Sequence, residues 1–185
     1  MEKWPIGVFT SIDEGLGVKF DVVRELGVPT IQLHAPSKAN RTRQAAEEFL
    51  VNLDDAGVVT TAVFGWFAGE SYADIPTVVK TVGLVPAETR AERTKEMYEI
   101  ADFAKVLKVD VVALHLGFVP HDKNDPLYGE VLEVTQGLCD HCKANGQALH
   151  LETGQETADA LVQFIGDVGR DNLFVNRDPA NMILY

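Results

Sequence analysis

Short apolar runs, most of them rich in β-branched residues, alternate along the 185-residue chain with segments patterned as amphipathic helices. Several runs are nearly continuous in apolar residues, which is typical of parallel strands covered by helices. The predicted strands are residues 6–10, 30–34, 59–64, 109–116, 147–152 and 173–178. This repeated strand–helix order predicts an α/β fold with a parallel sheet.

The segments between the predicted strands place apolar side chains at the i, i+3, i+4, i+7 spacing of a helix with one buried face. The first such face is predicted to contain Val18, Val22 and Leu26, and Gly27 is predicted to end that helix. The other predicted helices contain the apolar stripes at 46–53, 97–107, 131–142 and 161–168. The stretch 65–88 is longer than an ordinary connection, so we expect it to form a functional lid or additional elements.

Length, charge and cysteine content restrict the class of protein. A chain of this length predicts one domain, residues 1–185. The net charge of −12 argues against a nucleic-acid partner, because phosphate binding needs a basic face. We see no signal peptide, no run long enough to cross a membrane and, with two cysteines, no disulfide framework. We therefore predict a cytoplasmic protein without a membrane partner.

Polar residues gather at one end of the predicted strands. His34, His115, Glu152 and Asp178 each lie at or just beyond the carboxyl end of an apolar run. In a (β/α)8 barrel this rim carries the chemistry, and in an open doubly wound sheet the ligand also lies beyond these strand ends. The expected location of the site is therefore the same for both folds.

Glu152 and Asp178 are the strongest candidates for a metal site. A carboxylate at the end of a buried run is costly unless it is solvated, paired or bound to a metal. Two carboxylates from successive strands can converge on one cation, and oxygen ligands suit Mg²⁺ or Mn²⁺, whereas an added histidine would widen the choice to Zn²⁺ or Co²⁺. The alternative is that each carboxylate only caps the helix that follows it.

Other polar and aromatic residues have two possible roles. His115 and, more weakly, His34 are candidates for substrate contact, and Trp66 could wall a sugar-sized pocket or only anchor its loop. His150 lies two residues before Glu152 and is predicted to be a packed interior histidine. The remaining candidates, Cys139 and Cys142, fall on one face of a predicted helix and are expected to be buried structural thiols.

Four stretches resemble a known family. LHLETGQETADAL and NRDPANMILY are the most specific, and GESYADIPTVVKTVGLVPAETRAERTKE and VVALHLGFVPHD fit the same pattern. They resemble the sugar phosphate isomerase/epimerase group of the xylose isomerase-like TIM barrels, over the whole chain from IGVFTS onward. The resemblance implies a (β/α)8 barrel of the TIM type. Such barrels typically need about 250 residues, so we expect a chain truncated after about six βα units and incomplete at its C-terminus.

The resemblance also implies roles for individual residues. It implies one divalent ion (Mn²⁺, Mg²⁺, Co²⁺ or Zn²⁺) bound by Glu152 and Asp178, with Glu152 also acting as the catalytic acid/base. His115, Glu156, Trp66, His34 and Asn181 would contact substrate. Two further metal ligands of the family have no counterpart here, so a single chain is expected to hold the metal weakly or not at all.

Three function classes follow. The first is a metal-dependent sugar or sugar phosphate isomerase or epimerase that moves a proton next to a carbonyl, with a sugar or polyol substrate and with activity reduced in so short a chain. The second is a catalytically silent truncated barrel that acts as an oligomerising or binding module. The third, a DNA-repair endonuclease, is disfavoured by five histidines and the acidic charge. An open barrel would expose sheet edges, so we expect a homo-oligomer.

Overall fold

Seven parallel strands form one sheet in the computed structural model, which describes residues 3–13 and 15–184. The strand order is β2-β1-β3-β4-β5-β6-β7. The strands are β1 (Gly7–Ser11), β2 (Val18–Lys19), β3 (Thr30–His34), β4 (Val59–Gly65), β5 (Val111–Leu114), β6 (Ala148–Glu152) and β7 (Leu173–Asn176). The predicted α/β fold with a parallel sheet is confirmed.

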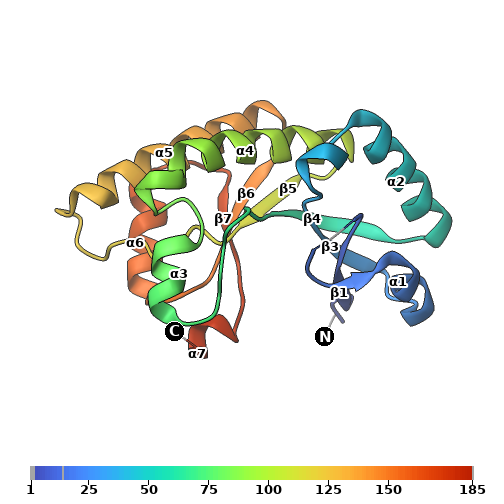
Figure 1. Ribbon diagram of the computed structural model, residues 1–185, viewed down its shortest axis with the longest axis horizontal. Coiled ribbons are helices and arrows are strands. Elements are labelled where there is room, and N and C mark those ends of the chain that lie inside the picture. Colours follow the sequence, from blue (N-terminus) through green and yellow to red (C-terminus); the bar gives the residue numbers. More distant parts are fainter. Residues whose placement is uncertain (1–2, 14, 185) are drawn as a thin grey trace.

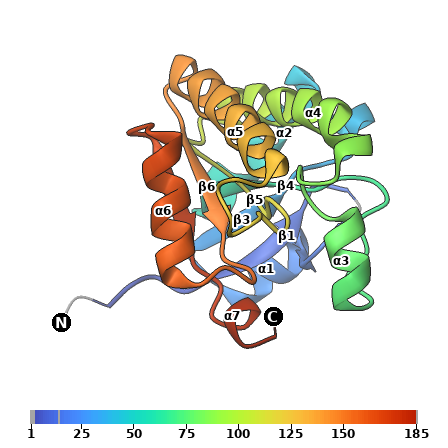
Figure 2. The same ribbon diagram turned by 90° about the vertical axis from the view of Figure 1, so that its left-hand side faces the viewer.

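Helices cover the outer face of this sheet (Figure 1). In chain order, the helices of the described residues are α1 (Phe20–Leu26), η1 (Lys38–Asn40), α2 (Arg43–Ala56), α3 (Ile75–Thr81), α4 (Ala87–Val106), α5 (Pro126–Ala144), α6 (Ala158–Val168) and α7 (Asn181–Leu184). Figure 2 shows the strands at the centre with α6, α5 and α4 arranged around them. Among the described residues, no helix is both long enough and apolar enough to span a membrane.

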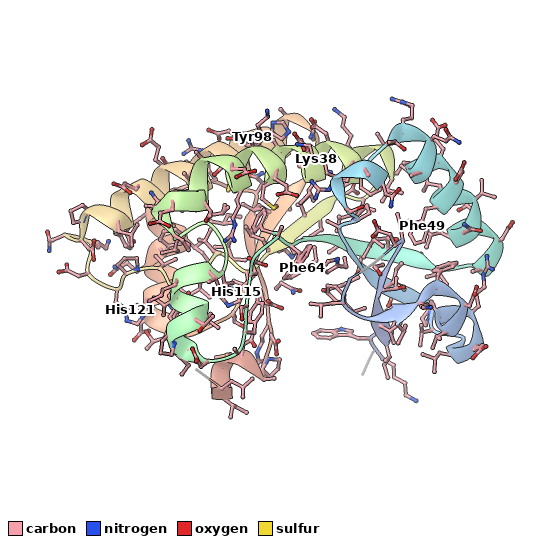
Figure 3. The ribbon with its side chains drawn as sticks, in the orientation of Figure 1. Lys38, Phe49, Phe64, Tyr98, His115 and His121 are labelled. Carbon is pink, nitrogen blue, oxygen red and sulfur yellow. The ribbon has the colours of Figure 1, made fainter. Side chains whose placement is uncertain are left out.

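The two faces of the sheet belong to two separate apolar clusters. Val63, Val112 and Leu114 lie in the main core between the sheet and the helices. Their neighbours Phe64 and Ala113 belong to a smaller cluster on the inner face, which also contains Ala62. Figure 3 shows Phe64 on the side of the sheet opposite α4 and α5. This alternation explains the nearly continuous apolar runs, because side chains on both faces of a strand are buried.

The sheet is strongly curved. Gln32 of β3 donates a hydrogen bond from Nε2 to Oδ1 of Asn176 in β7, at 3.0 Å. Strands β4, β5 and β6 lie between β3 and β7 in the sheet. In a flat sheet, four strand spacings would separate β3 from β7 by about 19 Å. The strands therefore curl around a common axis, as expected for the predicted TIM-barrel type of fold.

The first helix differs from its prediction. Val18 lies in strand β2 rather than in the helix, because Lys19 is still extended and α1 begins only at Phe20. Val23 is the buried residue of α1, whereas Leu26 is exposed, so the predicted apolar face was wrong. Gly27 ends the helix in a left-handed conformation with φ 62°, as predicted.

The long connection after β4 contains an additional element, as expected from its length. Helix α3 lies within it, and Asp74 caps this helix by accepting a hydrogen bond from the backbone N–H of Thr77 at 2.8 Å. The connection begins with Trp66 and Phe67 at the carboxyl end of β4. It therefore lies at the rim where the polar residues were predicted.

Candidate active site

The predicted site residues come from the same rim of the sheet, because all its strands run in one direction. His34 and Glu152 end β3 and β6, whereas His115 and Asp178 follow β5 and β7 by one or two residues. Trp66 follows β4 directly. Sequence spacing therefore placed these residues at the correct end of the strands.

Glu152 and Asp178 interact electrostatically. Burial and, to a smaller extent, the negative charge of Asp178 together raise the pKa of Glu152 to about 7. A carboxyl group in this environment favours either a proton or a nearby cation. Asp178 thus lies near enough to Glu152 for its charge to affect the ionisation of that carboxyl group.

The capping alternative has a different outcome for each carboxylate. Helix α6 is capped by Thr157, which accepts a hydrogen bond from the backbone N–H of Ala160 at 3.2 Å, so Glu152 is not its cap. Asp178 does act locally, because its Oδ1 accepts a hydrogen bond from the backbone N–H of Ala180 at 2.7 Å. For Asp178, a capping role and a ligand role are compatible, since a carboxylate has two oxygens.

Thr153 holds the Asp178 segment against the end of β6. Its hydroxyl donates to the backbone carbonyl of Asp178 at 2.9 Å and accepts from the backbone N–H of Asp178 at 2.8 Å. Its own carbonyl accepts a hydrogen bond from Nδ2 of Asn181 at 3.1 Å. Asn181, which the sequence assigned to substrate contact, therefore has a structural bond in this rim. Sequence reasoning missed Thr153, although its place directly after Glu152 was a usable signal.

His115 and Glu156 lie close together around Gly154. A Cβ added at Gly154 would lie 3.0 Å from Nε2 of His115 and 3.4 Å from Oε2 of Glu156. The same Oε2 accepts a hydrogen bond from the backbone N–H of Gly154 at 3.1 Å. Burial lowers the pKa of His115 to about 4, against the opposing influence of the negative charge of Asp178. His115 is therefore a neutral imidazole at pH 7, and burial raises the pKa of Glu156.

His34 lies on the other side of the rim and is covered by an aromatic side chain. The ring centroids of His34 and Trp66 are 5.4 Å apart. His34 is buried and burial lowers its pKa, whereas Trp66 is 38% exposed. Trp66, rather than His34, therefore presents a surface to a ligand here. Tyr72 plays a similar part opposite His115, with ring centroids 6.3 Å apart, and was not predicted.

The carboxylate pair fits a hard divalent cation only in part. Within residues 3–13 and 15–184, no group of three or more histidine, cysteine, aspartate or glutamate side chains could hold a metal ion. Mg²⁺, however, is often bound by one or two carboxylates, with water and substrate oxygens completing its octahedron. The donors present therefore suit Mg²⁺ or Mn²⁺ better than Zn²⁺, which prefers nitrogen and sulfur ligands.

The remaining candidates have structural roles. Cys139 and Cys142 are buried free thiols, and burial raises the pKa of each to about 12, which makes them unreactive. This confirms their prediction as structural residues. His150 packs against Phe174 with ring centroids 5.6 Å apart, as expected for an interior histidine.

Comparison with known proteins supports the sequence resemblance. The family described as xylose isomerase-like TIM barrel matches residues 20–185. A solved structure of a xylose isomerase domain protein from Planctomyces limnophilus is 57% identical with a TM-score of 0.96, and the match covers 98% of this chain and 64% of that chain. No curated protein matched the sequence.

More distant structures share the fold. A D-psicose 3-epimerase solved in the presence of D-fructose is 20% identical with a TM-score of 0.68, covering 97% of this chain and 65% of that one. A xylose isomerase-like TIM barrel protein from Mycobacterium smegmatis, in complex with magnesium, is 22% identical with a TM-score of 0.62, covering 88% and 55%. This chain thus spans less than two thirds of the length of these structures. The fold, the motifs and the match over most of its residues show that the chain belongs to the xylose isomerase-like TIM barrel family.

Proposed function

We propose that this site isomerises or epimerises a sugar or sugar phosphate by moving a proton on a carbon next to a carbonyl. The observation that carries the proposal is the raised pKa of Glu152, about 7, beside Asp178. A general base is most effective when its pKa lies near the operating pH. The family supports the choice of reaction class, since its solved members include proteins named as sugar epimerases.

Glu152 is the proposed acid/base. Its carboxylate takes the proton from the carbon next to the substrate carbonyl, and the electrons of that C–H bond form the carbon–carbon double bond of an enediolate. When the protonated Glu152 returns the proton to the neighbouring carbon and the hydroxyl proton moves between the two substrate oxygens, the substrate is isomerised. Epimerisation instead needs a second acid that protonates the original carbon from the opposite face. Neutral His115 can donate one hydrogen bond to a substrate oxygen without adding charge.

Glu152 and Asp178 are also the proposed holders of one divalent cation, which when bound would polarise the substrate oxygens and acidify the adjacent C–H. Glu156, Asn181 and the exposed face of Trp66 are the proposed substrate contacts. A carbohydrate ring packs well against an aromatic face while its hydroxyl groups bind nearby carboxylate and amide groups. The proposed chemistry thus uses every residue that the sequence placed at this rim except His34, which Trp66 covers.

The test is exchange of substrate hydrogen with solvent. Ketoses and aldoses are incubated with the protein and Mn²⁺ or Mg²⁺ in D₂O, and deuterium on the carbon next to the carbonyl is followed by NMR. We expect exchange that is lost in Glu152→Gln and retained in Glu133→Gln, an exposed carboxylate on α5. Exchange that is equal in both variants would refute the role of Glu152.

A second candidate is a silent barrel that acts as an oligomerising or binding module. The observation that favours it is the small number of metal ligands among the described residues. It predicts Mn²⁺ binding no tighter in the wild type than in Asp178→Asn, together with no solvent exchange on any sugar. Calorimetric titration with Mn²⁺ of these two proteins separates the candidates.

A further inference from the structure

The connection between β4 and α4 is fixed by a buried charged residue that the proposed chemistry does not use. Arg93 of α4 is 5% exposed. Its Nη1 donates to the backbone carbonyls of Thr81 at 2.6 Å and Gly83 at 2.8 Å, and its Nη2 donates to that of Ala68 at 3.3 Å. The three carbonyls come from both ends of the connection, so one guanidinium group ties these ends together.

Glu70, which is itself a residue of this connection, also binds its backbone. Its Oε1 accepts a hydrogen bond from the backbone N–H of Gly83 at 2.7 Å, and its Oε2 accepts from that of Phe67 at 3.3 Å. Gly83 thus donates its N–H to Glu70 and offers its carbonyl to Arg93. The guanidinium carbon of Arg93 also lies 5.3 Å from the ring centroid of Phe67, in a cation–π contact.

Gly83 also places the connection against the segment that follows β5. Its φ is +72°, and an added Cβ would lie 2.2 Å from the carbonyl oxygen of Leu116. The backbone N–H of Leu84 donates to the same carbonyl at 2.8 Å. One residue further, the N–H of Gly117 donates to Nδ1 of His115 at 3.1 Å. The connection after β4 is therefore packed against the segment that orients His115.

Two aromatic side chains of this connection, Trp66 and Tyr72, pack against histidines of the site. Trp66 packs on His34, and Tyr72 packs on His115. Tyr72 lies between the residues bound to Arg93 and Glu70, whereas Trp66 directly precedes Phe67, the first of these residues. The ring positions therefore depend on these two charged side chains, of which Arg93 is buried and Glu70 is partly buried.

We propose that Arg93 and Glu70, here called the loop clamp, are positioning residues that hold Trp66 and Tyr72 in place as one wall of the sugar site. Arginine suits this role because its planar group has five donors and can bind several carbonyls at once. A lysine at the same position offers a single point charge. The inference rests on the proposed function for the identity of the ligand, but the placement of Trp66 is measurable without any ligand.

The chain offers a spectroscopic test. It contains two tryptophans, and Trp4 is 88% exposed, so Trp4→Phe leaves Trp66 as the one fluorescent indole. In this background we expect Arg93→Met to shift the Trp66 emission to longer wavelength and to increase quenching by acrylamide. Glu70→Gln, which removes one of the two acceptor oxygens, should give a smaller change in the same direction.

A matched control lies on the same helix. Arg90 also donates to backbone carbonyls, those of Leu84 at 2.8 Å and Val85 at 2.6 Å, but these residues follow the clamped segment. Arg90→Met should therefore reduce thermal stability while leaving Trp66 emission and quenching unchanged. Trp66 fluorescence that is the same in Arg93→Met and Arg90→Met would overturn the inference, because Arg93 would then be only a stabilising residue.

Two further variants keep the test decisive if Arg93→Met does not fold. Arg93→Lys retains the charge with fewer donors, and Gly83→Ala forces the connection away from Leu116. Both should alter Trp66 fluorescence in the folded protein, and unchanged fluorescence in both would contradict the clamp. If sugars do exchange with solvent, we expect kcat/KM to fall by about tenfold or more in Arg93→Lys, since a misplacement of about 1 Å can have such an effect. Absence of exchange in the wild type refutes the proposed function, whereas the fluorescence comparison still decides the clamp.

Discussion

At the scale of single residues, the ionisation of Glu152 links the site to protein stability. Its pKa is raised from 4.5 to about 7, chiefly by burial and then by the charge of Asp178. Between these two values the folded protein retains a proton that the unfolded chain has released. The contribution of Glu152 to the free energy of unfolding is therefore greatest below pH 4.5. It is lost as the pH rises from 4.5 through 7.

Replacing Glu152 by glutamine should remove the loss of stability that ionisation of Glu152 causes at higher pH. We expect Glu152→Gln to raise the free energy of unfolding at pH 8 by about 1–3 kcal/mol, because each unit of pKa shift corresponds to about 1.4 kcal/mol. At pH 4.5 the two proteins should differ little. Urea unfolding at both pH values, with Glu133→Gln as the control, measures this difference. Equal stabilisation at both pH values would contradict the raised pKa.

The carboxylates of the candidate site were predictable from the sequence, whereas the residues that position its loops were not. Glu152 and Asp178 stood out because a carboxylate at the end of an apolar run is costly without a partner. Arg93 was missed, although it lies four residues before Met97 and seven before Ile100 on the buried face of α4. Its partners are backbone carbonyls, and the sequence does not show which carbonyls a connection will present.

At the scale of elements, the contact between the end of β6 and the segment after β7 sets the position of Asp178. Thr153 is buried and binds both the N–H and the carbonyl of Asp178 through one hydroxyl. Thr153→Val keeps the shape of the side chain but removes this hydroxyl, whereas Thr153→Ser keeps the hydroxyl. Loss of such buried hydrogen bonds costs on the order of 1–3 kcal/mol.

We therefore expect the amide hydrogen of Asp178 to exchange faster with solvent in Thr153→Val than in the wild type or in Thr153→Ser. Hydrogen exchange followed by NMR measures this directly. Slow exchange that persists in Thr153→Val would show that other contacts fix Asp178. The valine variant should also bind Mn²⁺ more weakly than the serine variant if Asp178 is a ligand.

The accuracy of the element predictions follows from how each element is stabilised. The long strands were predictable because both faces are buried, which leaves an unbroken apolar run. Strand β2 was missed because its two residues, Val18 and Lys19, are too short for a pattern. The face of α1 was wrong because the helix starts later than its apolar spacing indicated, and this start depends on the pairing of β2 with β1.

At the scale of the whole molecule, the curvature of the sheet rests on contacts across its interior. Gln32 and Asn176 bind each other although three strands separate β3 from β7 in the sheet. A double-mutant cycle with Gln32→Ala and Asn176→Ala should give a coupling of about 1 kcal/mol in the free energy of unfolding. Additive effects of the two substitutions would contradict a curved sheet in solution.

The outer strand β7 predicts association between copies of the chain. In the described residues β7 pairs with β6 alone, and its Phe174 and Val175 are 50% and 37% exposed. A strand edge with apolar side chains favours pairing with another chain. We expect light scattering coupled to gel filtration to give a mass above that of one chain, decreasing on dilution. A constant monomer mass at all concentrations would refute this expectation.

The bond between Gln32 and Asn176 also has a consequence for the order of events during synthesis. These residues are 144 positions apart in the chain. Residues of β3 leave the ribosome long before those of β7, so β3 is synthesised before the strand that it contacts across the interior. Closing so long a loop is also slow. During this interval the inner face of β1, β3 and β4, with Phe9 and Phe64, is accessible to chaperones and to neighbouring nascent chains.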